Sequence, residues 1–361
     1  MLKKRLNNYI ILNNLFNGNF TLKAFILAAG VGTRLRPLTF ELPKPMIPLV
    51  NKPVMAHTID NLKRHNISNI MMNLYFMPEM IADYFGNGEK FNINISYSKE
   101  ENLLGTAGGL KKCKDFFDST FIVMSGDGLS DIDITSAVEF HKKKKSLATM
   151  VLKKIDSKFE YGVTITDRKN KIVDFVEKPS WSSVFSDTVN TGIYIFEPEI
   201  FKYIPDGVYD FGKDLWPKLL KLKKPIYAYL MNGYWTDIGN IGEYKQGTCD
   251  ALKGIVKINI DGSKIKNTNV VSGENCKIDT TVRFIGKSVI GANCFIGKNV
   301  IIEDGTVIGD NVQINDGSII KNSIIWSNVK VGKEVKLYSS VIGTDVPDKL
   351  SVYNGLLFNI Q

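Results

Sequence analysis

The sequence predicts an α/β domain with a mainly parallel sheet, followed by a solenoid of short β-strands. Two observations predict it. Apolar runs of strand length alternate with amphipathic helix patterns over residues 23–253, and over residues 254–361 the apolar residues adopt a period of six. Alternating strands and helices favour a parallel sheet with helices on both faces. A six-residue period is typical of a parallel β-helix.

Five apolar runs are the predicted strands of the first domain: Ala24–Ala29, Ile70–Phe76, Ile93–Tyr97, Phe121–Ser125 and Ala148–Leu152. Helix patterns between them include the apolar series Met55, Ile59 and Leu62 and the segment Pro78–Phe85. In parallel sheets, ligands bind at the carboxyl ends of the strands. The loop that follows Ala29 and the pair Gly126–Asp127 are both predicted to lie there.

Two later segments are predicted to be β-rich insertions. Val163–Thr166 and Lys171–Val176 flank the polar turn at residues 167–170, which predicts a hairpin. Ile226–Met231 is a further predicted strand and leads into residues 232–239, a stretch with two glycines and an aspartate.

The solenoid is predicted from an unbroken series of isoleucines at positions 290, 296, 302, 308, 314 and 320. Ile325, Val331 and Leu337 continue the spacing after a slip of one residue. An α-helix would not keep this period, whereas a triangular coil of three hexapeptides stacks one isoleucine on the next. Cys276 and Cys294 fall at small inward positions, so we expect them to be packed core thiols.

The amino-acid composition indicates which kinds of partner the protein has and in which cellular compartment it works. The net charge of +9 comes mainly from lysine, and asparagine is also abundant. We interpret both as compositional bias and expect no nucleic-acid partner. No apolar segment is long enough to span a membrane, so we expect no membrane partner. Four scattered cysteines without a Cys-x-x-Cys pair favour a reducing cytoplasm over a zinc site or a disulfide framework. Residues 1–22 are expected to be a disordered extension.

The loop after the first strand is the strongest functional signal. It lacks the Gly-Lys-Ser/Thr of a phosphate-binding P-loop, and Leu35 stands where a dinucleotide fingerprint has its third glycine. Gly30 and Gly32 nevertheless allow the backbone to approach an anion. Only six arginines occur in the chain, and Arg34 is one of two in this loop. Lys44, between two prolines, adds a cation on a stiff segment, so the combination predicts a phosphate site.

Residues 27–39 together with Pro43–Pro45 resemble the signature of the sugar-1-phosphate nucleotidylyltransferases. Further motifs of that family follow in the same order, at Gly105–Gly109, Gly126–Asp127, Val176–Pro179, Val189–Gly192 and Trp235–Gly239. The resemblance covers nearly everything after residue 22 and is closest to bacterial mannose-1-phosphate guanylyltransferase-like proteins. It implies a Rossmann-like nucleotidyltransferase domain over residues 23–253 and a left-handed parallel β-helix over residues 254–361.

Members of this family join a nucleoside triphosphate to a sugar 1-phosphate and release pyrophosphate. The attacking phosphate is already ionised at neutral pH, so no general base is required. This agrees with a chain that has three histidines, none in a family motif; His57 and His65 are expected to be structural. Arginine, lysine and Mg²⁺ are the groups suited to neutralising the charge on the phosphates. GTP and mannose 1-phosphate are the favoured substrates, and glucose 1-phosphate with ATP, UTP or dTTP remains open.

The resemblance also implies residue roles. Arg34 and Lys44 are the expected catalytic cations. Nucleotide contacts are expected from Leu27, Ala29, Gly30, Gly32, Thr33, Gly105, Thr106 and Gly108. The segment Gly105–Gly109 is expected to pass beneath the nucleobase, where side chains would collide. Arg36 is expected to pack or pair on the outer side of the loop.

Asp127 and Asp237 are the expected metal ligands, because Mg²⁺ commonly takes one or two protein carboxylates beside phosphate oxygens and water. Asp131 and Asp133 are rivals, but both precede a helix pattern that starts near Thr135, so we expect them to be helix caps. The expected contacts to the sugar phosphate are Gly162, Glu177, Lys178, Asn190 and Thr191.

Two other classes of function remain open. Some relatives with a solenoid are catalytically weak regulatory subunits, but Arg34, Lys44, Asp127, Lys178 and Asp237 are all retained here. Some hexapeptide solenoids transfer acyl groups. No histidine follows residue 141, so the usual base of acyl transfer is missing from the tail. We therefore expect the solenoid to serve assembly and the protein to be a homo-oligomer.

Overall fold

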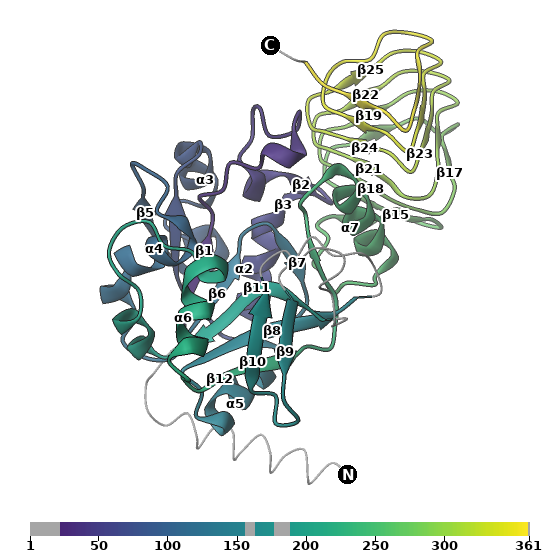
Figure 1. The fold of residues 1–361 in the computed structure, drawn as a ribbon. Helices are drawn as coiled ribbons and strands as arrows, with labels where there is room; N and C mark the ends of the chain where they lie inside the picture. The colour runs from purple at the N-terminus through teal and green to yellow at the C-terminus, as the bar shows by residue number, and fades with distance from the viewer. Residues whose placement is uncertain (1–21, 156–162, 177–187, 360–361) are drawn as a thin grey trace.

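The computed structural model describes residues 22–155, 163–176 and 188–359, which form a sheet domain followed by a β-helix (Figure 1). The sheet domain runs from purple to green in Figure 1, and the β-helix runs from green to yellow beside helix α7. This arrangement confirms the predicted fold class. No helix in the described ranges is long and apolar enough to cross a lipid bilayer.

The main sheet has β1 at its centre, between β6 and β4. Seven strands follow one another in space as β12 (Ile226–Leu230), β8 (Ala148–Lys154), β11 (Thr188–Phe196), β6 (Phe121–Ser125), β1 (Lys23–Leu27), β4 (Asn69–Leu74) and β5 (Asn94–Lys99). All neighbours are parallel except β11, which is antiparallel to both β6 and β8. The antiparallel hairpin of β9 (Val163–Thr166) and β10 (Ile172–Val176) extends from β11.

Helices cover both faces of this sheet, and alternate residues of β1 show how the two layers form. Ile26 packs in one core with α2 (Val54–Arg64), α3 (Pro78–Phe85) and α5 (Ile134–Lys144). Phe25 packs in the opposite core with α4 (Gly105–Lys112) and α6 (Trp216–Lys221). Successive side chains of a strand point to opposite faces, so a fully apolar strand serves both layers. Each buried apolar side chain contributes about 1.5–3 kcal/mol.

Two features of the sheet differ from the expectations. Ile226–Met231 was expected in a β-rich insertion, but β12 instead pairs in parallel with β8 at the edge of the main sheet. A short apolar run does not reveal its pairing partner. Strand β11 was not predicted from the sequence. The alternation of apolar and polar residues along β11 is interrupted at Gly192, which has a φ of 72°. The pairing register of β11 with β8 also shifts, between Asn190 and Tyr194. The predicted hairpin is present.

Short elements complete the sheet domain: β2 (Pro48–Leu49), β3 (Lys52–Pro53), β7 (Gly128–Ser130), β13 (Trp235–Asp237), the 3₁₀ segments η1 (Thr33–Leu35), η2 (Lys44–Met46), η3 (Glu89–Phe91), η4 (Lys114–Phe116) and η6 (Pro198–Lys202), and the π-helix η7 (Phe211–Leu215).

Three sheets form the sides of the β-helix. They contain β14 (Ser263–Lys264), β15 (Asn269–Ser272), β18 (Lys287–Ile290), β21 (Thr306–Ile308), β24 (Ile324–Ile325), β27 (Val341–Ile342) and β29 (Leu356–Leu357); β16 (Lys277–Ile278), β19 (Phe295–Ile296), β22 (Gln313–Ile314) and β25 (Lys330–Val331); and β17 (Arg283–Phe284), β20 (Ile301–Ile302), β23 (Ile319–Lys321), β26 (Lys336–Tyr338) and β28 (Ser351–Tyr353). The strand pairs are parallel apart from β14 with β15, consistent with the left-handed β-helix.

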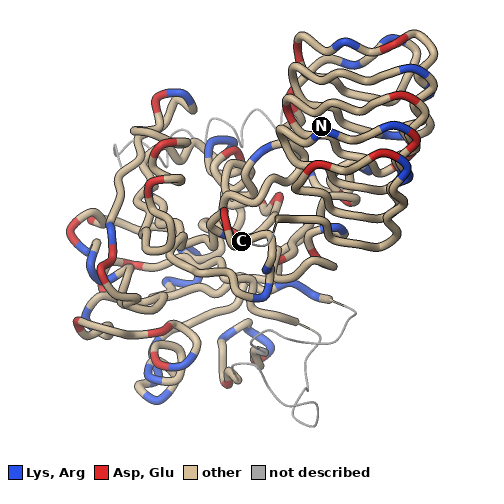
Figure 2. The backbone as a smooth tube through the Cα atoms, turned by 90° about the horizontal axis from the view of Figure 1, so that it is seen from above, with Lys and Arg blue, Asp and Glu red and all other residues tan. Residues whose placement is uncertain are grey.

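The inward positions of the β-helix agree with the six-residue period. Ile290 pairs with Ile308, which pairs with Ile325, so the same side chain stacks from coil to coil. Cys294 lies in this core with 1% exposure, and Cys276 packs against it, as expected for core thiols. Basic and acidic residues are interspersed along the coils (Figure 2).

Asparagine occupies many corners of the coils. Asn275, Asn293, Asn311 and Asn328 all have a positive φ, a conformation that asparagine tolerates better than most residues. Their side chains form a ladder in which each Nδ2 donates to the next Oδ1, at 3.3, 3.3 and 3.0 Å. Part of the asparagine content therefore has a structural reason beyond compositional bias.

The two domains share a core at α7 (Ile241–Lys253). Tyr244 of this helix is fully buried, and its hydroxyl donates to the carbonyl oxygen of Pro48 at 2.7 Å. The same hydroxyl accepts a hydrogen bond from Nε1 of Trp326 in the β-helix at 3.2 Å. One side chain thus joins the segment that follows Lys44 to the solenoid.

Candidate functional site

The glycine-rich loop follows β1 and turns at Gly32. Gly32 has a φ of 71°, and a Cβ at this position would lie 2.9 Å from Cβ of Lys44, so both the turn and the close approach require glycine. The turn leads into η1, which carries Arg34. Arg36 lies over the ring of Phe40, with 5.3 Å between Cζ and the ring centroid. Arg36 therefore packs on the loop, as expected.

A small two-stranded sheet brings the two acidic candidates together. Asp127 lies between β6 and β7, and Asp237 is the last residue of β13. Strand β13 pairs antiparallel with β7, which places Asp237 opposite Gly128. The pairing of β7 with β13 therefore brings Asp127 and Asp237 close together, which no local sequence pattern could predict.

Lys44 lies between these two carboxylates. Its Nζ is 3.0 Å from Oδ1 of Asp237 and forms a second, shorter ion pair with Oδ2 of Asp127. The Lys44 side chain is only 11% exposed, so these are largely buried pairs. Ser125 donates a hydrogen bond to Oδ1 of Asp127. Arg34 lies further out, with Nη2 4.0 Å from Oδ2 of Asp237.

The pKa values in this cluster follow from burial and mutual charge. Burial lowers the pKa of Lys44, but Asp127 and Asp237 outweigh that effect and raise it above its ordinary value. Burial raises the pKa of Asp127, whereas the charge of Lys44 reverses this and holds it below its ordinary value. Burial and then the charge of Asp127 raise the pKa of Asp237 to about 6, against the opposing effect of Lys44. One ammonium group cannot fully neutralise two carboxylates.

This charge balance suits an additional cation. Among the described residues, Lys44 neutralises one of the two carboxylates, and the second is offset only by the more exposed Arg34, whose Nη2 lies 4.0 Å from Oδ2 of Asp237. Hard divalent cations prefer such oxygen donors, and Mg²⁺ usually takes only one or two of them from protein. The described ranges contain no cluster of three or more His, Cys, Asp or Glu side chains able to hold a metal. A cation at Asp127 and Asp237 would therefore need further oxygen ligands from a substrate or water.

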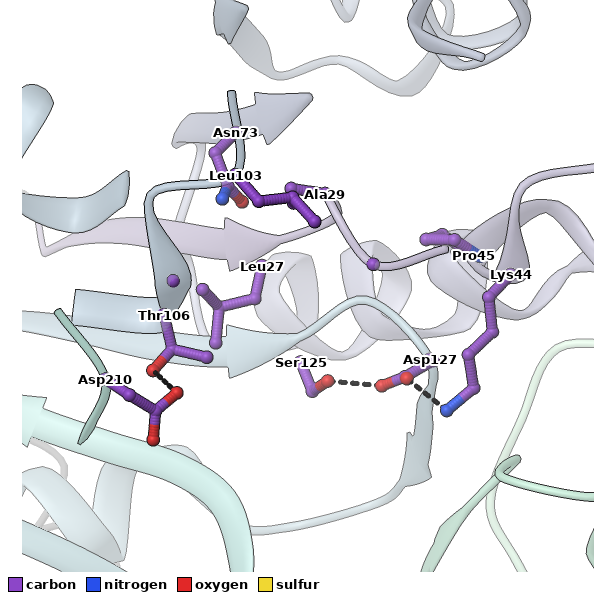
Figure 3. Close-up of a pocket in the computed structure, with 12 residues that line it drawn as sticks. Leu27, Ala29, Lys44, Pro45, Asn73, Leu103, Thr106, Ser125, Asp127 and Asp210 are labelled. Atoms are coloured by element: carbon purple, nitrogen blue, oxygen red, sulfur yellow. Dashed lines mark hydrogen bonds and ion pairs between the residues drawn. The ribbon is translucent and has the colours of Figure 1, made fainter. Parts of the chain in front are cut away.

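A cavity of about 270 Å³ lies beside this cluster (Figure 3). Its walls come from the loop after β1, from η2, from the ends of β4 and β6, and from the start of α4. The lining residues are Leu27, Ala29, Gly30, Lys44, Pro45, Asn73, Leu103, Gly105, Thr106, Ser125, Asp127 and Asp210. Figure 3 shows Lys44 beside Asp127 at one end of the cavity and Thr106 with Asp210 at the other.

The structure brings most of the expected nucleotide residues to this cavity. Leu27, Ala29, Gly30, Gly105 and Thr106 line it. Gly32 and Thr33 lie in the adjoining turn, and Gly108 is buried within α4.

Packing inside the protein explains two of the glycines of α4. A Cβ at Gly105 would lie 2.6 Å from the carbonyl oxygen of Tyr209, and one at Gly108 would collide with the carbonyl oxygen of Gly207. Thr106 donates to Oδ2 of Asp210 at 2.8 Å, which fixes the same contact. Close packing against residues 207–210 thus requires small residues here, whether or not a nucleobase lies above them.

Only part of the expected sugar-phosphate site can be placed. Gly162, Glu177 and Lys178 lie outside the described residues. Asn190 donates from Nδ2 to the hydroxyl of Tyr194 at 2.8 Å. The Thr191 side chain is buried, and its hydroxyl donates to the carbonyl oxygen of Val151 at 2.8 Å.

The expected caps and histidines can also be placed. Asp133 is the N-cap of α5 and accepts from the amide of Ser136 at 3.0 Å, so its expectation is confirmed. For Asp131 the expectation is wrong, because its carboxylate accepts from the amides of Tyr234 and Lys257 and caps no described helix. His57 lies within α2 and His65 directly follows it. Both make hydrogen bonds inside the protein, with Leu49 and Thr135, as expected for structural histidines.

Sequence reasoning missed several lining residues. Asn73 is a polar residue in the apolar run of β4, and it is only 2% exposed. Ser125 ends the apolar run of β6, and Asp210 precedes η7. A polar side chain at a position where the strand should be apolar was the available signal for Asn73, whereas nothing local pointed to Asp210.

Comparisons with known proteins identify the family of the chain. A family model described as nucleotidyl transferase matches residues 23–254, and a model described as the GMPPB C-terminal domain matches residues 266–355. The boundary between the two matches falls after α7.

Two relatives span most of the chain. The UTP–glucose-1-phosphate uridylyltransferase of Synechocystis sp. is 39% identical over 320 residues, covering 79% of this chain and 82% of the relative. The mannose-1-phosphate guanyltransferase of Yarrowia lipolytica is 34% identical over 352 residues, covering 92% of this chain and 94% of the relative. A solved structure from Bacillus anthracis, classed as a glucose-1-phosphate thymidylyltransferase and complexed with sucrose, is similar with a TM-score of 0.59 and 27% identity, covering 66% of this chain and 98% of its own.

Proposed function

Because this chain belongs to the nucleotidyl transferase family, we propose that it transfers a nucleotidyl group from a nucleoside triphosphate to a sugar 1-phosphate, releasing pyrophosphate. GTP and mannose 1-phosphate are the favoured substrates. The relative from Yarrowia lipolytica, which is aligned along nearly the whole chain, supports that choice. The observation that carries the proposal is the position of Lys44 between Asp127 and Asp237 at the edge of the cavity.

Gly30 supports a triphosphate in the loop. No atom lies within 4 Å of where its Cβ would be, and its φ is not positive, so neither packing nor backbone conformation demands glycine. Close approach of an anion to the backbone would explain it. The amides of Gly32 and Thr33 and the guanidinium group of Arg34 would hold the same phosphates. Leu27, Ala29, Gly105 and Thr106 would enclose the nucleoside, with Gly108 allowing α4 to pack closely.

The chemistry requires charge neutralisation more than proton transfer. The phosphate of a sugar 1-phosphate is ionised at neutral pH and can attack the α-phosphate without a base. Lys44 and Arg34 would offset the negative charge that develops on the α-phosphate and the leaving pyrophosphate. Each preorganised cation of this kind stabilises a transition state by about 2–4 kcal/mol. Lys44 would then release at least one of its carboxylates to reach a phosphate.

Mg²⁺ fits the carboxylate pair. Asp127 and Asp237 would hold it, because together they carry one more negative charge than Lys44 neutralises. When bound, Mg²⁺ polarises phosphate oxygens and shields their charge. Ser125 would keep the Asp127 carboxylate oriented through its hydrogen bond.

The sugar phosphate is proposed to bind at the strand end that carries Asn190 and Thr191, together with Gly162, Glu177 and Lys178. The adjacent Gly192 lies against the cavity wall, because a Cβ there would be 3.6 Å from Cβ of Ser125. Lys178 would pair with the sugar phosphate, and Glu177 and Asn190 would bind sugar hydroxyls. Thr191, whose hydroxyl is already used inside the protein, would act by holding this turn in place.

A second candidate is uridylyl transfer from UTP to glucose 1-phosphate. The 39% identity to the relative from Synechocystis sp. favours it. The same cations and carboxylates would serve either pair of substrates. We also propose a cytoplasmic homo-oligomer. Light scattering of the full chain tests the oligomer, and a mass near 40.4 kDa would contradict it.

A pyrophosphate-release assay tests the function. GTP, UTP, ATP and dTTP are each combined with mannose 1-phosphate and glucose 1-phosphate, with Mg²⁺, using the wild type and Asp127→Ala. We expect turnover highest with GTP and mannose 1-phosphate and loss of it in the variant. No turnover with any pair would end the proposal, and unchanged activity in Asp127→Ala would remove Asp127 from the metal site.

A further inference from the structure

A series of three hydrogen bonds runs through Asn73, which lines the cavity. The backbone amide of Ala28 donates to Oδ1 of Asn73 at 2.9 Å. Nδ2 of Asn73 donates to Oε1 of Glu100 at 2.8 Å. Oε2 of Glu100 accepts from the backbone amide of Leu104 at 2.9 Å. These hydrogen bonds link the loop after β1 to the loop before α4, and both loops contribute residues to the lining of the cavity.

The donor and the acceptor of each of these three hydrogen bonds are fixed. A backbone amide can only donate, so Asn73 must turn its oxygen to Ala28 and its nitrogen to Glu100. Leu104 also donates to Glu100. Glu100 therefore has to accept at both oxygens, which a carboxylate does and a carboxamide does not.

The pair is buried and closely covered. Asn73 is 2% exposed and Glu100 is 7% exposed. A Cβ at Gly109 of α4 would lie 2.5 Å from Oε1 of Glu100 and 2.8 Å from Nδ2 of Asn73. Glycine at this position therefore lets α4 press directly onto the pair. A buried carboxylate and amide held this closely are costly to arrange unless every donor and acceptor is used.

We propose that Asn73 and Glu100 are positioning residues that set the distance between the two nucleotide-binding loops. The inference rests on the proposed function, because it assumes a nucleotide that reaches from residues 103–106 to Gly30. Such a ligand binds well only if both loops are held at the right separation. Neither residue needs to contact the reacting phosphates for this role.

The hydrogen-bond directions allow a sharp test by exchange. Glu100→Gln presents an NH₂ group either to Asn73 or to Leu104, both of which donate, so one donor loses its acceptor. Asn73→Asp sets two carboxylates against each other. The double variant Asn73→Asp/Glu100→Gln restores every bond. The carboxylate introduced at position 73 accepts from Ala28 and from the carboxamide introduced at position 100, and the oxygen of that carboxamide accepts from Leu104.

The experiment measures KM and kcat for GTP and UTP, KM for the sugar 1-phosphate, equilibrium nucleotide binding, and the melting temperature. Each single variant is expected to raise the nucleotide KM and weaken binding about tenfold or more, equally for both nucleotides. KM for the sugar 1-phosphate should change less than about twofold, and the double variant should recover most of the loss. Asn61→Ser is the matched control, because Asn61 is also a buried asparagine, bonded to the carbonyl oxygen of Ile132 away from the cavity.

Three outcomes would overturn the inference. Melting temperatures lowered as in Asn61→Ser with unchanged nucleotide KM would show a purely structural pair. A changed preference between GTP and UTP would show that Glu100 reads the base. Absence of recovery in the double variant would contradict the hydrogen-bond directions. A wild type without any turnover would instead remove the proposed function itself, and this inference with it.

Discussion

Nζ of Lys44 lies 3.0 Å from Oδ1 of Asp237, although 193 residues separate the two in the chain. The same ammonium group pairs with Asp127. Without substrates, Lys44 is thus the counter-ion of the carboxylates that we propose as metal ligands. Lys44 and a divalent cation then compete for the same oxygens, and substrate phosphates would draw Lys44 away.

Replacing Lys44 with methionine should separate its two roles. We expect kcat to fall about 10²- to 10³-fold, because a cation at the phosphates is lost. Mn²⁺, used as a probe in the absence of nucleotide, should bind the variant several-fold more tightly than the wild type, since the competing ammonium group is gone. Isothermal titration with Mn²⁺ measures this. Weaker binding in Lys44→Met would contradict competition and would make Lys44 part of the cation site.

Asp237→Asn should nearly abolish activity while the fold survives. Loss of one of two protein ligands is expected to lower kcat on the order of 10²-fold or more. Asp133→Asn is the matched control, because Asp133 caps α5 and asparagine caps equally well. Pyrophosphate release at several Mg²⁺ concentrations gives both values. Equal activities of the two variants would exclude Asp237 from the site.

Local patterns predicted the elements that local interactions decide. Phe121–Ser125 and Pro78–Phe85 were predicted with the bounds that the structure shows, because an apolar run and a helical spacing are sufficient signals. The isoleucine period predicted the β-helix for the same reason. The parallel position of β12 depends on a strand far away in the sequence, and no such signal predicts it.

In the candidate site, too, local patterns predicted some residues, whereas contacts between distant segments were not predicted. Arg34 and Lys44 stood out because a loop with glycines and cations is unusual within a single stretch of sequence. The meeting of Asp127 with Asp237 needed the pairing of β7 with β13. Asn73 was missed because its partners, Ala28 and Glu100, come from separate segments.

Tyr244→Phe should loosen the junction between the two domains. The lost hydroxyl leaves the carbonyl oxygen of Pro48 and Nε1 of Trp326 without this partner in a buried place. We expect the free energy of unfolding to fall by about 1–3 kcal/mol. Tyr353→Phe, at a residue that is 62% exposed, should change the free energy of unfolding by less than about 0.5 kcal/mol. Urea unfolding followed by tryptophan fluorescence measures both, and equal stabilities would show that the Tyr244 hydroxyl contributes nothing at this junction.

His57 is the clearest source of pH-dependent stability. Its Nε2 lies 2.8 Å from the carbonyl oxygen of Leu49, so this nitrogen carries the proton. Nδ1 is buried with no partner among the described residues, and a second proton there would be an unpaired buried charge. Burial lowers the pKa of His57 below 6.5, against the weaker effect of the Leu49 bond, and burial likewise lowers the pKa of His65.

A histidine whose pKa is lowered on folding binds fewer protons in the folded state. Its contribution to the free energy of unfolding is therefore complete above pH 6.5. That contribution is lost as the pH falls below 6.5 toward the pKa of the folded state. We expect the free energy of unfolding to fall as the pH drops below about 6.5, by up to about 1.4 kcal/mol per pH unit for each such histidine. His57→Gln, whose amide still donates to Leu49, and His65→Gln should each flatten this slope. Urea unfolding at several pH values measures the slopes, and a slope unchanged by His57→Gln would show that His57 accepts its second proton in the folded protein.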